Sequence, residues 1–284
     1  MGHLGHPFPM TESPAIYFDS HMHTPLCKHA EGHPIEYMQH GVSKNLKGII
    51  MTCHSPMPDR FSHRVRMSPE QFGTYMEMVS EAAEEAPDGF DVLLGMESDW
   101  FPGMEPWLTE LHSSADFHYI LGSVHWHIPE YIDAFWKGDS SAFRIQYFEH
   151  LAESAESGLF DSLAHPDLVK NASPEDWHFE TVQPHIESAL DRIAASGVAM
   201  ELNTSGLNKV MPEMNPGPQM LELMCSRGIP VVIGSDSHNP GRVGESFLSG
   251  LGMLEKAGYD KVSIFRERKR QDLLISKVKE TIAP

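Results

Sequence analysis

The chain alternates short apolar segments with amphipathic segments along most of its length, and this alternation limits its possible folds more than any other feature. The apolar segments are mostly β-branched and lack regular polar alternation, which is typical of strands buried on both faces of a parallel sheet. Repeated strand–helix units predict an α/β fold, and about seven units favour a closed barrel over an open sheet. The predicted strands are 15–18, 48–52, 91–96, 117–123, 161–164, 198–202 and 230–234, with a weaker eighth at 261–265.

Helix signals lie between these strands. Pro34 fits the first turn of a helix that ends before Gly48. The stretch SPEQ at 68–71 is a capping box that opens a helix to about residue 86, and further helices are predicted at 184–196, 218–227 and 244–256. No linker or low-complexity segment divides the chain, so residues 1–284 are predicted as one domain in which 1–14 form a flexible arm.

Composition disfavours several classes of function. The chain has 40 acidic and 21 basic residues and a formal net charge of −19, which disfavours nucleic acid as a partner because binding its phosphates needs clustered Lys and Arg. The basic run RERKR at 266–270 is predicted as the solvated face of a helix. No apolar run approaches the roughly 20 residues of a membrane span, and the first ten residues do not have the pattern of a signal peptide. Three cysteines without C-x-x-C spacing favour a reducing, cytoplasmic setting.

Each of the seven predicted strands carries, at its carboxyl end, a candidate metal ligand or a polar side chain that could hydrogen-bond to such a ligand. Two histidines one residue apart share a face of an extended chain, because side chains there alternate with a period of two. In a β/α barrel the carboxyl ends of the strands meet at one mouth, where active sites are found. In chain order these residues are His21, His23 and His29, then His54, Glu97, His125 and His165, then Glu201 and Asn203, and finally Asp236 and His238.

These residue types predict a centre with several metals. Imidazole and carboxylate ligands suit Zn, Mn or Fe, whereas Mg and Ca prefer oxygen ligands. Seven histidines and two carboxylates exceed the needs of one ion, so the pattern predicts two or three divalent transition metals, with Glu97 able to bridge two of them. Clustered metals favour activation of water and clamping of a charged oxyanion, as in phosphoester hydrolysis.

The same residues stand in blocks that resemble the polymerase and histidinol phosphatase (PHP) superfamily of metal-dependent phosphoesterases. In chain order the blocks are DSHMHT, CKHA, TCHSP, GMESDWFPG, LGSVHWH, LAHPDLVK, ELNTSGL and GSDSHNPGRVG. The stretches HTPLCKHA, ESDWFPG, NTSGLNK and SDSHNPGRVG are most similar to the histidinol-phosphatase branch. The resemblance implies a distorted (β/α)7 barrel of the TIM type with a trinuclear metal centre. It further implies hydrolysis of a small phosphorylated substrate, L-histidinol phosphate, to L-histidinol and phosphate in histidine biosynthesis.

The resemblance also implies how the ligands are shared among the metals. Among the candidate ligands, the expected catalytic residues are His21, His23, Glu97, His165 and Asp236. The sequence departs from the family at Cys53, where relatives often have an acidic residue. The implied ligand sets are His21, His23, Glu97 and Asp236 for the first metal, Glu97, His125 and His165 for the second, and His29, His54 and His238 for the third.

Three cations are candidate anchors for the substrate phosphate. Lys170 and Arg242 follow ligand-bearing strands, and Arg242 comes just after the block GSDSHNP. Arg64 lies in the segment 58–67, which could form a lid over the mouth.

The other polar residues near the strand ends keep two roles open. The leaving group needs a proton, and a metal-bound water, or Asp161 or His165 acting through water, could supply it. Asp99 and Glu201 either orient metal-bound histidines, which is the favoured role, or hold a cationic end of the substrate.

Four other functions fit parts of the pattern. A phosphoesterase of the same fold acting on another small phosphorylated metabolite or a nucleotide would use the same ligands, so only a substrate panel separates it. A nuclease is disfavoured by the charge of −19. An amidohydrolase-type barrel also begins with H-x-H and ends with Asp, but it bridges its metals by a carboxylated lysine, where this chain has Glu97. A non-catalytic zinc store would bind metal without turning over any phosphoester.

Overall fold

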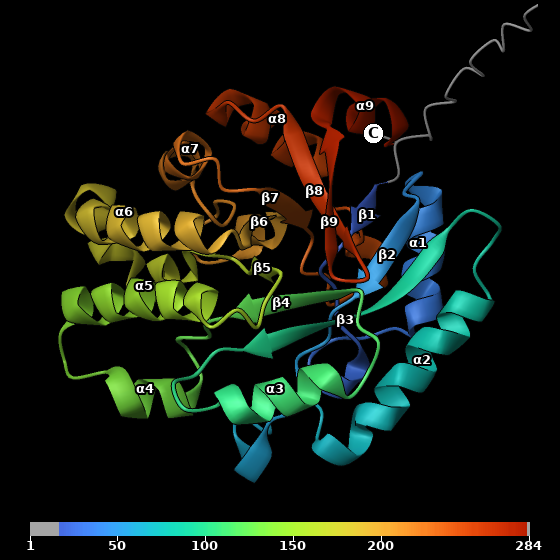
Figure 1. Cartoon of the computed structure of the whole chain (residues 1–284), viewed down its shortest axis with the longest axis horizontal. Helices are drawn as coiled ribbons and strands as arrows, with labels where there is room; N and C mark the ends of the chain where they lie inside the picture. Colours follow the sequence, from blue (N-terminus) through green and yellow to red (C-terminus); the bar gives the residue numbers. More distant parts are fainter. Residues whose placement is uncertain (1–16, 283–284) are drawn as a thin grey trace, which may run out of the picture.

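A computed structural model describes residues 17–282, so the predicted arm at 1–14 lies outside the described residues, as does the start of the first predicted strand. Seven parallel strands form one sheet in which each strand pairs with the next along the chain. The sheet curls into a nearly closed barrel (Figure 1), so the predicted fold class is confirmed. The strands are β1 (Phe18–Asp19), β2 (Gly48–Met51), β3 (Asp91–Asp99), β4 (Tyr119–Ser123), β5 (Ser162–Leu163), β6 (Ala199–Asn203) and β7 (Val231–Gly234).

The barrel closes between the segments that follow β1 and β7. Met22 and Ser237 form a parallel bridge. The backbone N–H of His23 donates to the carbonyl of Ser237 at 2.9 Å, and the N–H of Ser237 donates to the carbonyl of His21 at 3.1 Å. The closure therefore fixes the backbone that carries both histidines of the H-x-H pattern.

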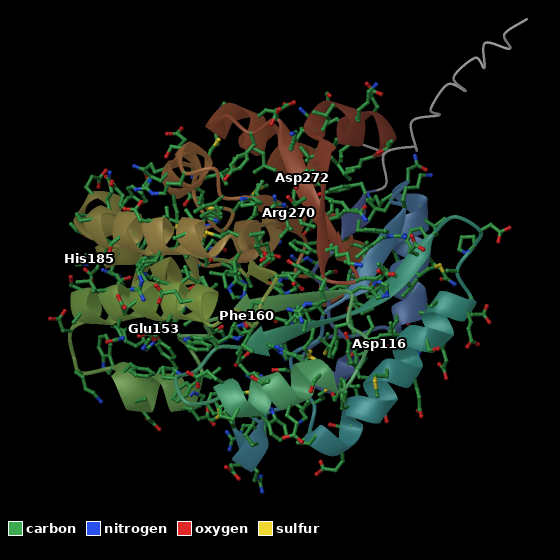
Figure 2. The ribbon with its side chains drawn as sticks, viewed as in Figure 1. Asp116, Glu153, Phe160, His185, Arg270 and Asp272 are labelled. Atoms are coloured by element: carbon green, nitrogen blue, oxygen red, sulfur yellow. The ribbon has the colours of Figure 1, made fainter. Side chains whose placement is uncertain are left out.

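Helices follow the strands and cover the outside of the barrel (Figure 1). The first position of α1 is Pro34, as the sequence predicts. A capping box at His33 and Glu36, which was not predicted, opens the helix. The prediction for α6 was wrong at its start, because the helix begins at Phe179 and contains Pro184. Within residues 17–282 the helices are α1 (Pro34–Ser43), α2 (Phe72–Glu84), α3 (Glu105–Ser113), α4 (Pro129–Phe135), α5 (Ser140–Glu156), α6 (Phe179–Ser196), α7 (Pro218–Ser226), α8 (Phe247–Ala257) and α9 (Ile275–Thr281). Figure 2 shows His185 on the outer side of α6.

None of the helices within residues 17–282 has the length and apolar character that crossing a membrane requires.

The predicted eighth strand exists as β8 (Lys261–Arg266), but it lies outside the barrel sheet. It pairs antiparallel with β9 (Lys269–Leu274) to form a hairpin. Phe265 stacks on Tyr119 at the start of β4, with ring centroids 5.3 Å apart, within an apolar cluster inside the barrel. The hairpin therefore covers the amino-terminal end of the barrel and leaves the carboxyl ends of the strands free for a site.

The basic run at 266–270 covers the end of β8, the turn and the start of β9, so the prediction of a helix face was wrong. Glu267 and Arg268 have φ values of +50° and +60°, which turn the chain between the two strands. Arg268 pairs with Asp161 at 2.7 Å, and Arg270 pairs with Asp272 on β9 at 3.1 Å (Figure 2). Asp161 is therefore at the end of the barrel opposite the mouth, which removes it as a proton donor to a substrate there.

Candidate metal centre

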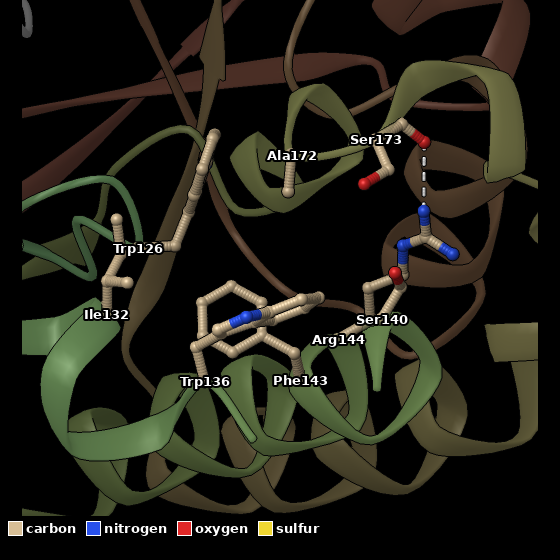
Figure 3. Close-up of a pocket in the computed structure, with 8 residues that line it drawn as sticks. All are labelled: Trp126, Ile132, Trp136, Ser140, Phe143, Arg144, Ala172 and Ser173. Atoms are coloured by element: carbon tan, nitrogen blue, oxygen red, sulfur yellow. Dashed lines mark hydrogen bonds between the residues drawn. The ribbon is translucent and has the colours of Figure 1, made fainter. Parts of the chain in front are cut away.

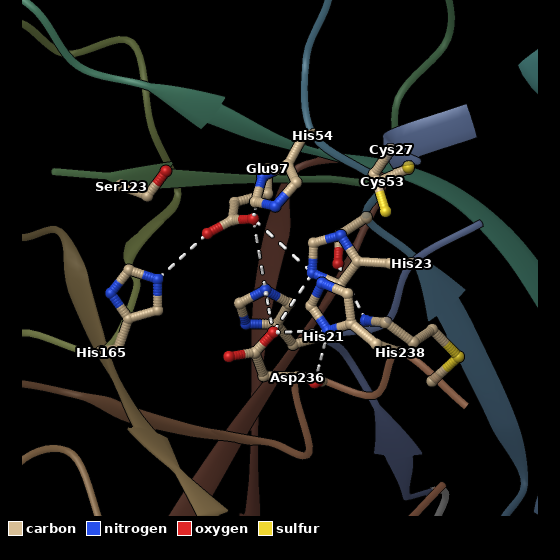
Figure 4. A network of polar contacts seen from close by, with 12 residues as sticks. His21, His23, Cys27, Cys53, His54, Glu97, Ser123, His165, Asp236 and His238 are labelled. Carbon is tan, nitrogen blue, oxygen red and sulfur yellow. Dashed lines mark hydrogen bonds and ion pairs between the residues drawn. The ribbon is translucent and has the colours of Figure 1, made fainter. Parts of the chain in front are cut away.

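Glu97, two residues before the end of β3, lies at the middle of a cluster of histidines (Figure 4). Its side chain is fully buried. The two carboxylate oxygens face two different groups of ring nitrogens, which is the arrangement that a carboxylate bridging two metals needs. Around Oε2 lie His21 Nε2 at 3.5 Å, His23 Nε2 at 3.6 Å and His54 Nδ1 at 2.7 Å, and around Oε1 lie His125 Nε2 at 3.3 Å and His165 Nε2 at 3.1 Å.

The charge of Glu97 is maintained by its neighbours. Burial disfavours the ionised form, but the imidazoles of His54, His125 and His21 hold the pKa of this carboxyl well below its ordinary value. Glu97 is therefore a carboxylate at neutral pH, as a metal ligand must be.

Asp236 follows β7 and completes the group around the first two histidines. Its Oδ1 is 3.2 Å from His23 Nε2 and 3.6 Å from His21 Nε2. The backbone φ is +47° at Asp236 and +26° at His165, in a region that residues other than glycine rarely adopt. Such strain persists only where the surrounding structure fixes a residue, and it is concentrated at functional sites.

Buried carboxylates behind the cluster orient two of the histidines. His21 Nδ1 donates to Glu201 Oε1 at 2.7 Å, and His125 Nδ1 donates to Asp99 Oδ1 at 2.9 Å. Partners of this kind fix which ring nitrogen is free to bind a metal and raise the basicity of the imidazole. Of the two roles predicted for Asp99 and Glu201, the structure supports orientation.

Gly234 at the end of β7 allows Glu201 to reach His21. A Cβ at position 234 would clash with Oε1 of Glu201 and with Cβ of His21. The glycine is therefore needed for close approach, and any larger residue would displace the carboxylate from its histidine.

Arg66 ties the segment 58–67 to the same carboxylates. Its guanidinium is buried, pairs with Asp99 Oδ2 and donates to the carbonyl of Ser55 at 3.2 Å. In the same segment, the backbone N–H of Ser62 donates to Glu130 Oε1 at 2.8 Å. The segment is thus anchored beside the site rather than laid across the mouth as a lid.

Two partly exposed histidines face each other at the mouth. His29 Nδ1 donates to the carbonyl of Cys27 at 2.7 Å, and His238 Nδ1 donates to the carbonyl of Asp236 at 3.1 Å. A carbonyl can only accept, so these bonds place the hydrogens on Nδ1 and leave lone pairs on both Nε2 atoms. The two Nε2 atoms are 2.9 Å apart. Two lone pairs at this distance repel each other unless a cation lies between them. The two Nε2 atoms are therefore placed to share a proton or to bind a metal.

The donor set fits divalent transition metals. Several ring nitrogens and one carboxylate oxygen at the centre are buried and have no hydrogen-bond partner within residues 17–282, among them His21 Nε2, His23 Nε2, His54 Nδ1 and Glu97 Oε2. Buried polar atoms without partners are costly, and a metal ion would satisfy them. The groups whose ligand atoms lie within 4.8 Å of one another include His21, His23 and Asp236, then His54, Glu97 and His125, then His23, His54 and His238.

A cleft of about 550 Å³ opens onto these residues. Arg242 lines it, donates Nε to Glu245 at 2.8 Å and has a buried Nη2 without a partner within residues 17–282, so a donor remains available. Lys209 also lines the cleft, with Nζ 3.9 Å from Asp236 Oδ2. Lys209 was not among the predicted anchors, although it follows a ligand-bearing strand just as Lys170 and Arg242 do. The cleft is further lined by Trp126, His127, Leu168, Asn171, Asn208 and Val210.

The structure does not bring the other two predicted anchors to the cleft. Lys170 is fully buried, and its Nζ donates to Asp167 Oδ2 at 3.0 Å, to Glu213 Oε2 at 2.9 Å and to the carbonyl of Met214 at 2.9 Å. All three ammonium hydrogens are used, so the prediction of Lys170 as a phosphate anchor was wrong. Arg64 is exposed and does not line the cleft, so its prediction is corrected as well.

Lys170 is instead expected to stabilise the fold. Replacing it with Met keeps the volume but leaves Asp167 buried without its cation, which costs about 3 kcal/mol of unfolding free energy. Denaturant unfolding of the Lys170→Met variant measures this loss. At a temperature where the variant is folded, its KM for a phosphorylated substrate should stay unchanged, and a large rise in KM would return Lys170 to substrate binding.

A second pocket of about 230 Å³ lies beside the cleft, between α4, the start of α5 and the segment around residue 172 (Figure 3). Trp126 lines both spaces, with its indole N–H donating to the carbonyl of Leu168 at 3.1 Å. The guanidinium of Arg144, which lines this second pocket, donates hydrogen bonds to the carbonyls of Ser173 and Asp176. The indole of Trp126 thus forms a fixed wall of the cleft.

The barrel and its cluster of histidines and carboxylates at the carboxyl ends of the strands define a metal-dependent hydrolase of the β/α-barrel class. The PHP domain model matches residues 19–205, and the chain belongs to this family.

Several relatives and solved structures are similar to this chain. A Deinococcus radiodurans protein named "Probable histidinol-phosphatase" is 36% identical over 89% of this chain and 98% of its own length. The Bacillus subtilis histidinol-phosphatase is 24% identical over 82% of this chain and 97% of its own length. Among solved structures, Lactococcus lactis histidinol phosphate phosphatase in complex with zinc, L-histidinol and phosphate has a TM-score of 0.73 and 19% identity, covering 90% of this chain and 98% of that chain. This likeness supports the barrel fold.

Proposed function

We propose that the protein is a metal-dependent phosphomonoesterase that hydrolyses L-histidinol phosphate to L-histidinol and phosphate. The observation that carries this proposal is Glu97, whose two oxygens face separate groups of histidines at the base of an open cleft. The 36% identity over nearly the full length of a relative with that name supports the choice of substrate.

The proposed centre holds two to three ions of Zn, Mn or Fe. Glu97 joins the first two sites, and the facing Nε2 atoms of His29 and His238 mark the third. When bound, the metals would activate water and neutralise charge on the phosphate oxygens. The proposed ligands are His21, His23, Glu97 and Asp236 at the first site, Glu97, His125 and His165 at the second, and His29, His54 and His238 at the third.

Lys209 and Arg242 are the proposed phosphate anchors. Both line the cleft, they approach it from different loops, and Arg242 retains a buried donor without a partner within residues 17–282. Charged donors on the phosphate oxygens hold the substrate against the centre and favour the charge of the transition state.

Replacing Arg242 with Ala is expected to raise KM for the phosphorylated substrate about 10- to 100-fold, because a charge-assisted hydrogen bond contributes about 1.5–3 kcal/mol. Lys209→Ala should act in the same direction. Initial rates over a range of substrate concentrations, with metal content determined on the same samples, measure the effect. The exposed Arg64→Ala serves as the matched control, and an unchanged KM in Arg242→Ala would exclude it as an anchor.

The substrate assignment is tested by initial rates on L-histidinol phosphate, on a panel of sugar and nucleotide phosphates and on p-nitrophenyl phosphate. Selective turnover of histidinol phosphate by protein that contains two to three metals per chain supports the proposal. A full metal complement without that preference would favour the alternative, a PHP phosphoesterase for another small phosphorylated metabolite or nucleotide. A nuclease role remains disfavoured by the net charge of −19.

A further inference from the structure

The histidines of the centre differ in what holds the ring nitrogen that faces away from the metals. In four of them this nitrogen donates a hydrogen bond to an oxygen atom. The acceptor is a carboxylate oxygen for His21 and His125 and a backbone carbonyl for His29 and His238. His23 is held differently. Its Nε2 faces Asp236 and Glu97, and its Nδ1, like that of His165, is buried and has no hydrogen-bond partner within residues 17–282.

The sulfur of Cys53 lies close to the His23 ring. Both residues are fully buried. Their ligand atoms, with Sγ of Cys27, lie within 4.8 Å of one another. Figure 4 shows Cys53 and Cys27 together on the His23 side of the network, on the opposite side from His165.

The position of the Cys53 sulfur is fixed by the chain that carries His23. Thr24 donates to Sγ twice, from its hydroxyl at 3.2 Å and from its backbone N–H at 3.4 Å. The backbone N–H of Cys53 is in turn bound to the hydroxyl of Tyr75 at 3.3 Å. A sulfur held by these contacts cannot move away from the imidazole without breaking them.

We propose that Cys53 is the positioning residue of His23, with its sulfur as the acceptor that keeps the hydrogen on Nδ1 and presents Nε2 to the first metal. This inference rests on the proposed metal centre and extends it to a residue outside the ligand set. An N–H···S bond is longer and weaker than the N–H···O bonds of His21, His125, His29 and His238. His23 is therefore the ligand of the first site whose orientation depends on a soft, oxidisable atom.

The test is zinc affinity, measured by competition with a chromophoric chelator, together with the rate of zinc release to excess chelator. Cys53→Ala removes the acceptor and is expected to weaken zinc binding about 10- to 100-fold, as loss of a ligand's outer partner does in metal sites. Cys53→Ser replaces the sulfur with an oxygen acceptor and should restore the affinity to within a few-fold of the unaltered protein.

Cys27→Ala is the matched control, because it removes a buried sulfur from the same cluster and leaves the Cys53 contact with His23 in place. It should bind zinc as the unaltered protein does. Thermal unfolding of the metal-free variants checks that each is folded, and the serine variant keeps the test valid if the alanine variant is not.

Three results would overturn the inference: unchanged affinity in Cys53→Ala, equal weakening in Cys53→Ala and Cys27→Ala, or a serine variant as weak as the alanine variant. Failure of the unaltered protein to bind zinc would overturn both this inference and the proposed centre. If zinc affinities follow the expected pattern but histidinol phosphate is not turned over, only the substrate proposal fails.

Discussion

Replacing Glu97 with Gln should abolish phosphatase activity and remove most of the bound metal. The amide keeps the shape of the side chain but offers one neutral oxygen where the carboxylate offers two charged ones, so it cannot serve two sites at once. The effect should be the largest of any single substitution, because five histidine nitrogens lie within 3.6 Å of this carboxylate. Turnover rates and metal content per chain, measured on the same sample, give the result.

The control for Glu97→Gln is Glu77→Gln, which makes the same chemical change at an exposed position on α2. It should leave activity and metal content unchanged. Loss of activity with a full metal complement would show that Glu97 acts on the reaction without bridging, and near-normal turnover would remove it from the centre.

The sequence sufficed to predict the barrel and the residues at its mouth because both follow from local rules. Buried parallel strands such as β2 and β7 are short continuous apolar runs, and their carboxyl ends must meet at one edge. The side chains after each strand therefore converge regardless of the conformation of the loops between the strands. His54 illustrates this, since it is 43 residues from Glu97 in the chain and lies 2.7 Å from it in the structure.

Other parts depend on contacts that no local pattern records. The α5 helix was missed because its buried side includes polar residues, Arg144 and His150, which obscure an apolar stripe. Lys170 and Lys209 both follow ligand-bearing strands, yet one is enclosed by Asp167 and the distant Glu213 while the other reaches the cleft. The role of β8 as a cover for the barrel is likewise set by the packing of Phe265 on Tyr119.

Asp99 contacts both His125 and Arg66, and a substitution there is expected to have two separable effects. It accepts from His125 and pairs with Arg66, and both contacts are buried. Burial disfavours its charge, but Arg66 and His125 hold the pKa of this carboxyl below its usual range. Asp99→Asn leaves the Arg66 charge buried without its counter-ion, which should lower the free energy of unfolding by about 3–5 kcal/mol. It also leaves His125 without a carboxylate, which should weaken zinc binding about 10- to 100-fold.

A second substitution separates these effects. In the double variant Arg66→Met, Asp99→Asn no buried charge remains unpaired, so denaturant unfolding should show that much of the lost stability returns. Zinc affinity should stay as low as in Asp99→Asn, because His125 still lacks its carboxylate partner. If affinity recovers together with stability, the loss of metal in the single variant reflected loosening of the fold, and Asp99 would be a structural residue alone. If stability returns without affinity, the carboxylate serves the metal centre through His125 and the segment 58–67 through Arg66.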